Sequence, residues 1–203
     1  MTNRIPSYLE YIKNIAVTSG GSGYTQAPAI SISAPDGDNP IQATATSVIS
    51  GGVITSITIV ESGDGYHTTP TVKIVGNPTT VQNTSSPDST RDAGTYTGVA
   101  PDSTSGSGAN ATFDIVIDSN GDVTSITPNA VGVFYAQGDT ISFSGTSLGG
   151  QGTELDVTGT ITHIFGGQNA VLTAEVDIVS KADVYSQPKI SKLVSSQLPE
   201  FIR

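Results

Sequence analysis

Short stretches of alternating apolar and polar residues follow one another along the chain, separated by glycines. A period of two is typical of a half-buried β-strand, since successive side chains point to opposite faces of a sheet. Glycine ends these stretches because it readily adopts the positive φ angles of tight turns. The sequence therefore predicts short strands joined by glycine turns. The alternation is clearest at Ile15 and Val17, Ile30 and Ile32, Ile57 and Ile59, and Val72 and Ile74.

An internal repeat organises these strands. Residues 15–24 recur as residues 57–66, and a weaker third copy covers residues 126–135. Each copy is predicted to form a strand, a glycine corner and a second strand. We expect the tyrosine ring to cover the corner while its hydroxyl stays in water. The predicted corner residues are Gly23, Tyr24, Gly65, Tyr66 and Tyr135.

Hairpins are predicted between the copies. Residues 43–57 surround a Gly-Gly pair, and residues 111–126 surround an Asn-Gly pair, which favours a tight turn that matches strand twist. A third hairpin is predicted over residues 155–178, around a second Gly-Gly pair. About ten short strands at regular spacing predict an all-β fold, a β-sandwich or a stacked β-repeat array, with short helical or extended terminal segments.

The repeats define the predicted domain organisation. A body over residues 14–180 contains repeats near 15–56, 57–125 and 126–180. Residues 77–107 interrupt the second repeat and are rich in Ser, Thr, Pro, Asp and Gly. Because this insertion has little apolar surface to bury, we expect a flexible surface loop, or an arm ordered by a partner.

The two ends, residues 1–13 and 181–203, are predicted to be docking segments. In each, residues spaced i, i+3, i+4 and i+7, all apolar except Gln197, predict one face of a short helix. Neither helix is long enough to be stable in water by itself. Each therefore packs either on the body of its own chain or on another subunit. The spacing is formed by Ile5, Tyr8, Leu9 and Ile12 and by Ile190, Leu193, Val194 and Gln197.

Composition supports the β prediction, and the charge distribution sets the ends apart. The chain has 38 Ile and Val against 6 Leu, and branched side chains suit a pleated surface. The net charge of −10 combines a body of 15 acidic and 2 basic residues, net −13, with ends of net +1 and +2. Basic ends favour docking on an acidic neighbour, including a second copy.

The same charge narrows the range of partners. An acidic surface repels phosphate, so we expect no nucleic-acid partner. The first sixteen residues contain no unbroken apolar run, so we expect neither a secretory signal nor a membrane partner.

Candidate catalytic chemistry is sparse. The chain has no cysteine, which excludes disulfides and cysteine-ligated metals. His67 and His163 are the only near-neutral bases, and no nucleophile motif, phosphate loop or zinc motif accompanies them. We therefore predict a non-enzymatic protein with no catalytic residue, no cofactor and no metal site.

Two binding alternatives stay open beside this prediction. The acid-rich turns at residues 36–39 and 118–122 offer oxygen ligands for calcium, although Asn and Asp are also ordinary turn residues. The repeated tyrosines offer stacking platforms for a host surface glycan, although their equal position in every copy favours a structural corner.

Two of these features together resemble a known class of proteins. The repeat of Ile/Val strand, Gly-Gly-Ser-Gly-Tyr-Thr, proline and second strand resembles repeats in virion structural proteins of tailed phages. The segment from Lys189 to Arg203, ending in Gln-Leu-Pro-Glu-Phe-Ile-Arg, is similar to a motif of tail or baseplate proteins of cyanophages. The resemblance covers roughly residues 15–110 and 189–203. The resemblance implies a component of the virion particle, made in the host cytoplasm.

The leading hypothesis is a structural subunit of a phage tail or baseplate that assembles through its ends, with other virion proteins and copies of itself as partners. The alternatives are a receptor- or glycan-binding adhesin module on the virion, and a head or neck decoration protein. The predicted partner-binding residues are Ile5, Tyr8, Leu9, Ile12, Lys189, Ile190, Leu193, Val194, Leu198, Phe201, Ile202 and Arg203.

Overall fold

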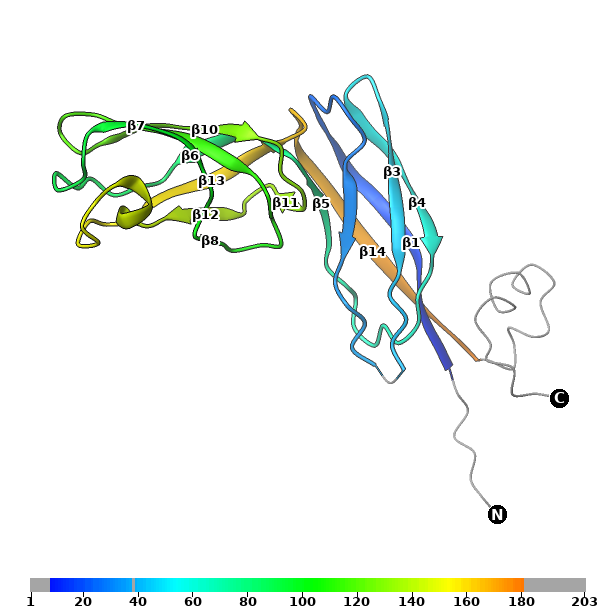
Figure 1. The fold of residues 1–203 in the computed structure, drawn as a ribbon. Coiled ribbons are helices and arrows are strands. Elements are labelled where there is room, and N and C mark those ends of the chain that lie inside the picture. The colour runs from blue at the N-terminus through cyan, green and yellow to red at the C-terminus, as the bar shows by residue number, and fades with distance from the viewer. Residues whose placement is uncertain (1–7, 38, 181–203) are drawn as a thin grey trace, which may run out of the picture.

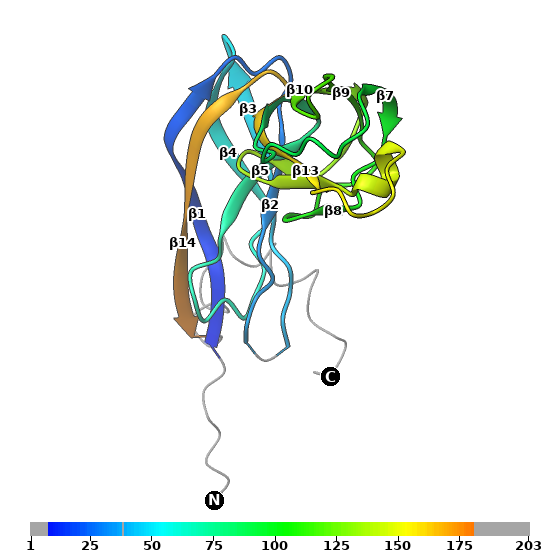
Figure 2. The same cartoon turned by 90° about the vertical axis from the view of Figure 1, so that its left-hand side faces the viewer.

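The computed structural model describes residues 8–37 and 39–180, and this part of the chain is almost entirely β. Strands make up 57% of it, and no α-helix occurs among the described residues. The all-β prediction is confirmed. The strands form two lobes that meet at one end of the first lobe (Figures 1 and 2).

The first lobe places a two-stranded ribbon against a five-stranded sheet. Its core lies between the two layers, where Ile12, Ile15 and Ala174 of the ribbon face Ala43 and Tyr66. The ribbon is β1 (Tyr8–Ser22) with β14 (Gln168–Ser180). The sheet has the order β11 (Tyr135–Ala136), β5 (Val72–Gly76), β2 (Ala29–Ile32), β3 (Thr44–Ser50) and β4 (Val53–Glu61).

The second lobe is inserted between β5 and β14 and consists of two further sheets around an aromatic core. Phe113 lies edge-on to Phe143 and Tyr135, with ring centroids 5.7 and 6.4 Å away. The first sheet has the order β10 (Val123–Ala130), β9 (Thr112–Ile117) and β7 (Gly94–Val99). The second has the order β6 (Pro78–Asn83), β13 (Val157–Ile164), β12 (Thr140–Phe143) and β8 (Ser103–Thr104), followed after β12 by a 3₁₀ turn at Gly145–Leu148.

Tyr135 connects the two lobes. Its backbone pairs with Gly76 of β5 in the first lobe, while its ring packs in the core of the second.

The predicted N-terminal helix is wrong for the described residues. Tyr8, Leu9 and Ile12 lie in β1, which pairs antiparallel with β14 along its length. A register shift between Ile12 and Asn14 marks a bulge, so Ile12 and Ile15 are both buried. A bulged strand therefore produced an apolar spacing that imitates a helix. Ile12 is fully buried in the core and not available to a partner, and Ile5 lies outside the described residues.

Two of the three predicted hairpins are confirmed. β3 pairs with β4, and β9 pairs with β10. The third differs, because β13 pairs with β12 and β6 whereas β14 pairs with β1. The turn at Gly166 and Gly167 is present and is closed by a single bridge between Ile164 and Gly167. It carries the chain from one lobe to the other.

Residues 77–107 are not the loop that their composition predicted. They contain β6, β7 and β8, which pair with β13, β9 and β12. Val81, Tyr96 and Val99, the sizeable apolar residues of this segment, all pack against the second core. Backbone pairing with strands elsewhere in the chain orders a segment that has little apolar surface of its own.

Arg91 holds the middle of residues 77–107 in place through hydrogen bonds from its buried side chain. Its side chain is buried, and Nη1 donates to the carbonyls of Ser86 (2.9 Å) and Gly121 (3.2 Å). Nε donates to the carbonyl of Leu155 (3.0 Å), and Nη2 to that of Asp156 (3.2 Å). One guanidinium therefore joins the segment to the β9–β10 turn and to the chain that leads into β13.

We expect Arg91→Met to lower the free energy of unfolding by about 3 kcal/mol, because four carbonyl acceptors lose their charged donor at a buried site. Lys13→Met is the matched control, since the Lys13 side chain is 59% exposed and its ion-pair partner Asp177 is 39% exposed. The control should cost less than about 1 kcal/mol. Urea unfolding measures both, and equal losses would contradict the role of Arg91.

Candidate functional site

The three repeat tyrosines occupy equivalent buried corners. The exposed fractions of Tyr24, Tyr66 and Tyr135 are 5%, 1% and 1%. The hydroxyl of Tyr66 accepts a hydrogen bond from the backbone N–H of Ala43 at 2.9 Å. The ring of Tyr66 lies against Gly63 of its corner, and the ring of Tyr135 lies against Gly132. The prediction of a solvated hydroxyl is wrong for Tyr66, because the oxygen is needed to satisfy a buried backbone donor.

The other two tyrosine hydroxyls are placed alike. Burial raises the pKa of Tyr24 and of Tyr135, and backbone hydrogen bonds with Ala170 and Ala111 respectively offset part of the effect. The pKa of Tyr66 is likewise raised, first by burial, with the Ala43 N–H offsetting part of the effect. Each hydroxyl is therefore held protonated and directed at a backbone group.

The corner backbone also repeats. Gly23 and Gly65 have φ angles of +83° and +81°, as expected for glycines at a tight corner. The third copy has Phe134 at the equivalent position with φ +61°, a conformation that costs a bulky side chain about 1–2 kcal/mol. The corner conformation persists there although glycine is replaced.

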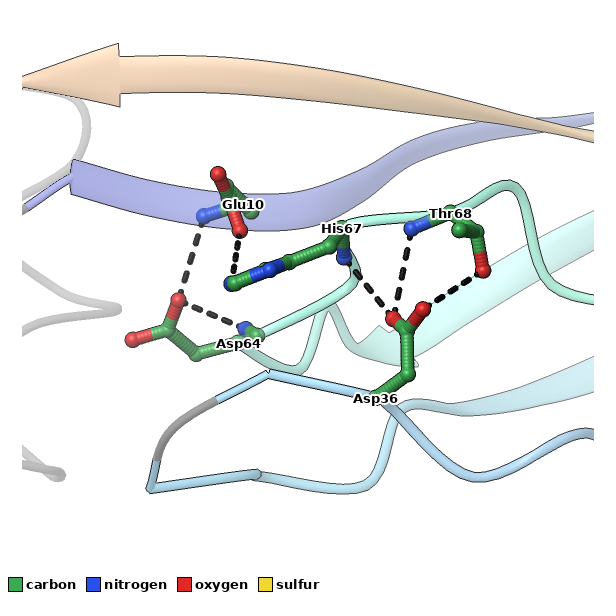
Figure 3. Close-up of polar contacts among 6 residues, drawn as sticks. Glu10, Asp36, Asp64, His67 and Thr68 are labelled. Carbon is green, nitrogen blue, oxygen red and sulfur yellow. Dashed lines mark hydrogen bonds and ion pairs between the residues drawn. The ribbon is translucent and has the colours of Figure 1, made fainter.

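The second corner is fastened to the beginning of β1. Asp64 Oδ1 accepts hydrogen bonds from the backbone N–H groups of Glu10 (3.1 Å) and Gly65 (2.8 Å). The N–H of Tyr66 donates to the carbonyl of Glu10 at 2.9 Å. The His67 Nε2 atom lies 2.7 Å from Glu10 Oε2, as Figure 3 shows. Glu10 thus contacts the corner through its N–H, its carbonyl and its carboxylate.

The loop between β2 and β3 closes over the same corner. Asp36 Oδ1 accepts from the N–H groups of His67 (3.0 Å) and Thr68 (3.2 Å), and Oδ2 accepts from the Thr68 hydroxyl (2.8 Å), as drawn in Figure 3. The Thr68 hydroxyl, followed by the Thr68 N–H, lowers the pKa of Asp36 below its ordinary value. These contacts join β1, the second corner and the β2–β3 loop. We call the residues that make them the corner cluster: Glu10, Asp36, Asp64, His67 and Thr68.

One carboxylate of each calcium candidate accepts hydrogen bonds from backbone N–H groups. Asp36 is engaged as described, and Asp118 Oδ1 accepts from the N–H groups of Asn120 (2.8 Å) and Asp122 (3.0 Å). These bonds, first that from the Asn120 N–H, lower the pKa of Asp118. Among residues 8–37 and 39–180, no three His, Asp or Glu side chains are grouped to hold a metal ion.

The two histidines lie in different settings. His67, with its side chain 54% exposed, contacts Glu10, and His163 Nδ1 lies 3.1 Å from the Thr162 hydroxyl. An ion pair as exposed as that of His67 and Glu10 contributes about 0–1 kcal/mol when the imidazole is protonated. The corner cluster therefore positions the beginning of β1, and its hydrogen bonds are those of a structural junction.

The structure brings the two ends of the described chain together. Tyr8 pairs with Ser180 at the end of the first lobe that lies away from the second lobe (Figure 1). Leu9 is half-buried beside them. The other predicted partner-binding residues lie outside the described residues, namely Ile5, Lys189, Ile190, Leu193, Val194, Leu198, Phe201, Ile202 and Arg203.

The corner cluster was not predicted from the sequence. Its one available signal was Asp64, which stands between the glycines of the second corner where the first copy has Ser22. An Asx residue in such a place bonds nearby backbone N–H groups. Nothing local relates Glu10 or Asp36 to that corner, because the contacts join residues 31 to 57 positions apart.

The chain was compared with protein-family models, curated proteins and solved structures, and none of them matches. In the described part of the chain, no helix has the length and apolar character needed to cross a membrane.

We expect Tyr66→Phe to lower the free energy of unfolding by about 1–2 kcal/mol, because the Ala43 N–H is left without its acceptor in a buried place. Tyr96→Phe is the control, since the Tyr96 hydroxyl donates to the Asp92 carbonyl where water can replace it. The control should cost less than about 0.5 kcal/mol. Chemical denaturation compares the two, and a neutral Tyr66→Phe would contradict the role of the corner hydroxyl.

Proposed function

We propose that the protein is a non-enzymatic structural subunit of a tailed-phage virion, in the tail or baseplate, that assembles through its terminal segments. The observation that supports this proposal is the pairing of Tyr8 with Ser180. It brings both connections to the terminal segments to one end of the first lobe, while the second lobe extends from the other end (Figure 2). In this arrangement, the end of the first lobe that holds Tyr8 and Ser180 attaches to neighbouring subunits, and the second lobe points away from them.

Charge supports the same arrangement. Residues 181–203 carry four of the eight cations of the chain and a net charge of +2, whereas residues 14–180 carry −13. A basic segment is attracted to the acidic body of a neighbouring copy, and salt weakens that part of the contact more than its apolar part. The resemblance of residues 189–203 to a tail or baseplate motif is consistent with this attachment.

The adhesin alternative loses its main argument. Stacking on a sugar requires an exposed ring face, and the rings of Tyr24, Tyr66 and Tyr135 are buried in the two cores. An exposed apolar loop does remain on the molecule, since Val131 and Phe134 are 74% and 54% exposed. That loop suits a protein contact better than a glycan.

Deleting residues 189–203 tests the proposal. The body over residues 14–180 should keep its melting temperature. The amount of the protein in purified particles should fall at least tenfold when the variant is the only copy expressed. Loss of incorporation with an unchanged melting temperature identifies docking, because a folding defect would lower both.

Point substitutions provide the matched control. Leu193→Asp should reduce incorporation as the deletion does, whereas Val60→Asp, on an exposed position of β4, should leave it unchanged. Normal incorporation of the deletion variant would overturn the proposal.

A further inference from the structure

The third corner differs from the other two in its exposed side chains. Three positions that hold glycine or a polar residue in the first two copies hold large apolar residues in the third. These side chains lie at the surface, with exposed fractions of 74% at Val131, 41% at Val133 and 54% at Phe134. The corresponding residues are Gly20, Ser22 and Gly23 in the first copy and Ser62, Asp64 and Gly65 in the second.

The turn itself does not require these apolar side chains. The first two copies turn the chain with glycine at a positive φ, whereas Phe134 adopts φ +61° at a steric cost that glycine avoids. Its ring is more than half exposed, so burial recovers little of that cost. Strained backbone of this kind is concentrated at functional sites. The other two corners thus serve as internal controls, and they indicate that the apolar side chains of the third corner contact a partner.

The backbone of the third corner is held on both sides of Phe134. The N–H of Gly132 donates to Asn77 Oδ1 at 2.9 Å, and Val133 and Ala109 exchange two backbone hydrogen bonds of 3.0 Å. Tyr135 then pairs with Gly76 of β5. Because the backbone is fixed in advance, a contact at this corner loses little entropy in ordering it.

An open groove of about 220 Å³ lies near this corner, where β11 runs beside β5 (Figure 1). Residues 72–74 of β5 line the groove, and Asn77 follows them by three residues, which is roughly 10 Å along an extended chain. A cavity of about 150 Å³ is enough for a benzene ring. The groove can therefore receive an aromatic side chain. Its apolar lining includes Tyr24, Val72, Ile74, Ile164, Val171 and Leu172.

Charge favours a second copy of this chain as the occupant. Residues 128–138 contain no Asp, Glu, Lys, Arg or His. Lys73, the cation in the groove wall, lies 4.0 Å from the carboxylate of Asp139, so these two charges offset each other. Residues 14–180 carry a net charge of −13, and two copies repel each other least where neither presents a net charge. A basic partner would gain no charge attraction at such a place.

We infer that the third corner is a contact between two copies of this chain, in which Phe134 of each copy occupies the groove of the other. A two-fold symmetric contact requires a projecting surface and a matching hollow on the same part of one chain, because each is then used twice. An aromatic ring fills the groove without backbone hydrogen bonds, so the contact needs no free strand edge. The terminal segments take no part in it, and it is therefore separate from the docking proposed above.

Sedimentation of the full chain tests the inference. Phe134→Gly restores the residue of the other two corners. This variant should keep the melting temperature of the dilute monomer, because glycine relieves the strain, and it should raise the dissociation constant of the dimer at least tenfold. Val171→Asp should raise it equally, since it places a charge where the ring binds.

Two variants at similarly exposed positions are the matched controls. Leu155→Ala is the control for Phe134→Gly, with exposed fractions of 53% and 54% for the two wild-type residues. Val60→Asp is the control for Val171→Asp, with exposed fractions of 59% and 51%. Each control should change the dissociation constant less than twofold.

Salt distinguishes this contact from one that the basic ends make. Higher salt screens the repulsion between two acidic bodies, so the dimer should become tighter. An attraction between a basic end and an acidic body would instead become weaker.

Four results would overturn the inference. The first is a full chain that stays monomeric at every salt concentration, and the second is a dissociation constant that Phe134→Gly leaves unchanged. The third is a dimer that tolerates Val171→Asp, which would remove the groove from the contact. The fourth is a marked fall in the melting temperature of the Phe134→Gly monomer, which would assign the ring a structural role.

Discussion

The pairing of β1 with β14 is the constraint on which the rest of the molecule depends. It pairs Tyr8 with Ser180 and Ser22 with Gln168. The last described strand therefore lies beside the first, and all the other strands lie between them in the sequence. The second lobe is consequently an insertion between β5 and β14. The same pairing closes the first core over Ile12 and Ala174. A pairing this distant in sequence costs loop-closure entropy, which the buried core must offset.

Polar contacts inside the body stabilise the fold that the pairing of β1 with β14 defines. Asp64 and the backbone of Tyr66 hold Glu10 of β1, and Arg91 connects four carbonyls in the second lobe. These contacts use carboxylates, a guanidinium and tyrosine hydroxyls as partners for backbone groups. Residue types that often perform chemistry therefore serve here to satisfy backbone donors and acceptors.

Local features of the fold were predictable from the sequence, and non-local ones were not. The hairpins at Gly51-Gly52 and Asn120-Gly121 and the positive φ of Gly23 and Gly65 depend on neighbouring residues, and all are present. The bulge after Ile12 imitated a helix because it depends on β14. The strands within residues 77–107 depend on β13, β9 and Arg91, which composition does not reveal. In the candidate site, the tyrosine corners could be predicted from the repeat. The corner cluster could not, because it joins residues that are distant in the sequence.

The central claim, that the two ends of the body are held side by side, is tested by a disulfide between Glu10→Cys and Ile178→Cys. These residues are direct partners, and the N–H and carbonyl of Glu10 bond away from β14, so they form a non-hydrogen-bonded pair with Cα atoms about 4.5 Å apart. That spacing lies within the range of disulfides. The account predicts a quantitative intramolecular disulfide that raises the melting temperature, and none in a Glu10→Cys, Val171→Cys control. Free thiols in the folded double variant, or equal cross-linking in the control, would contradict it.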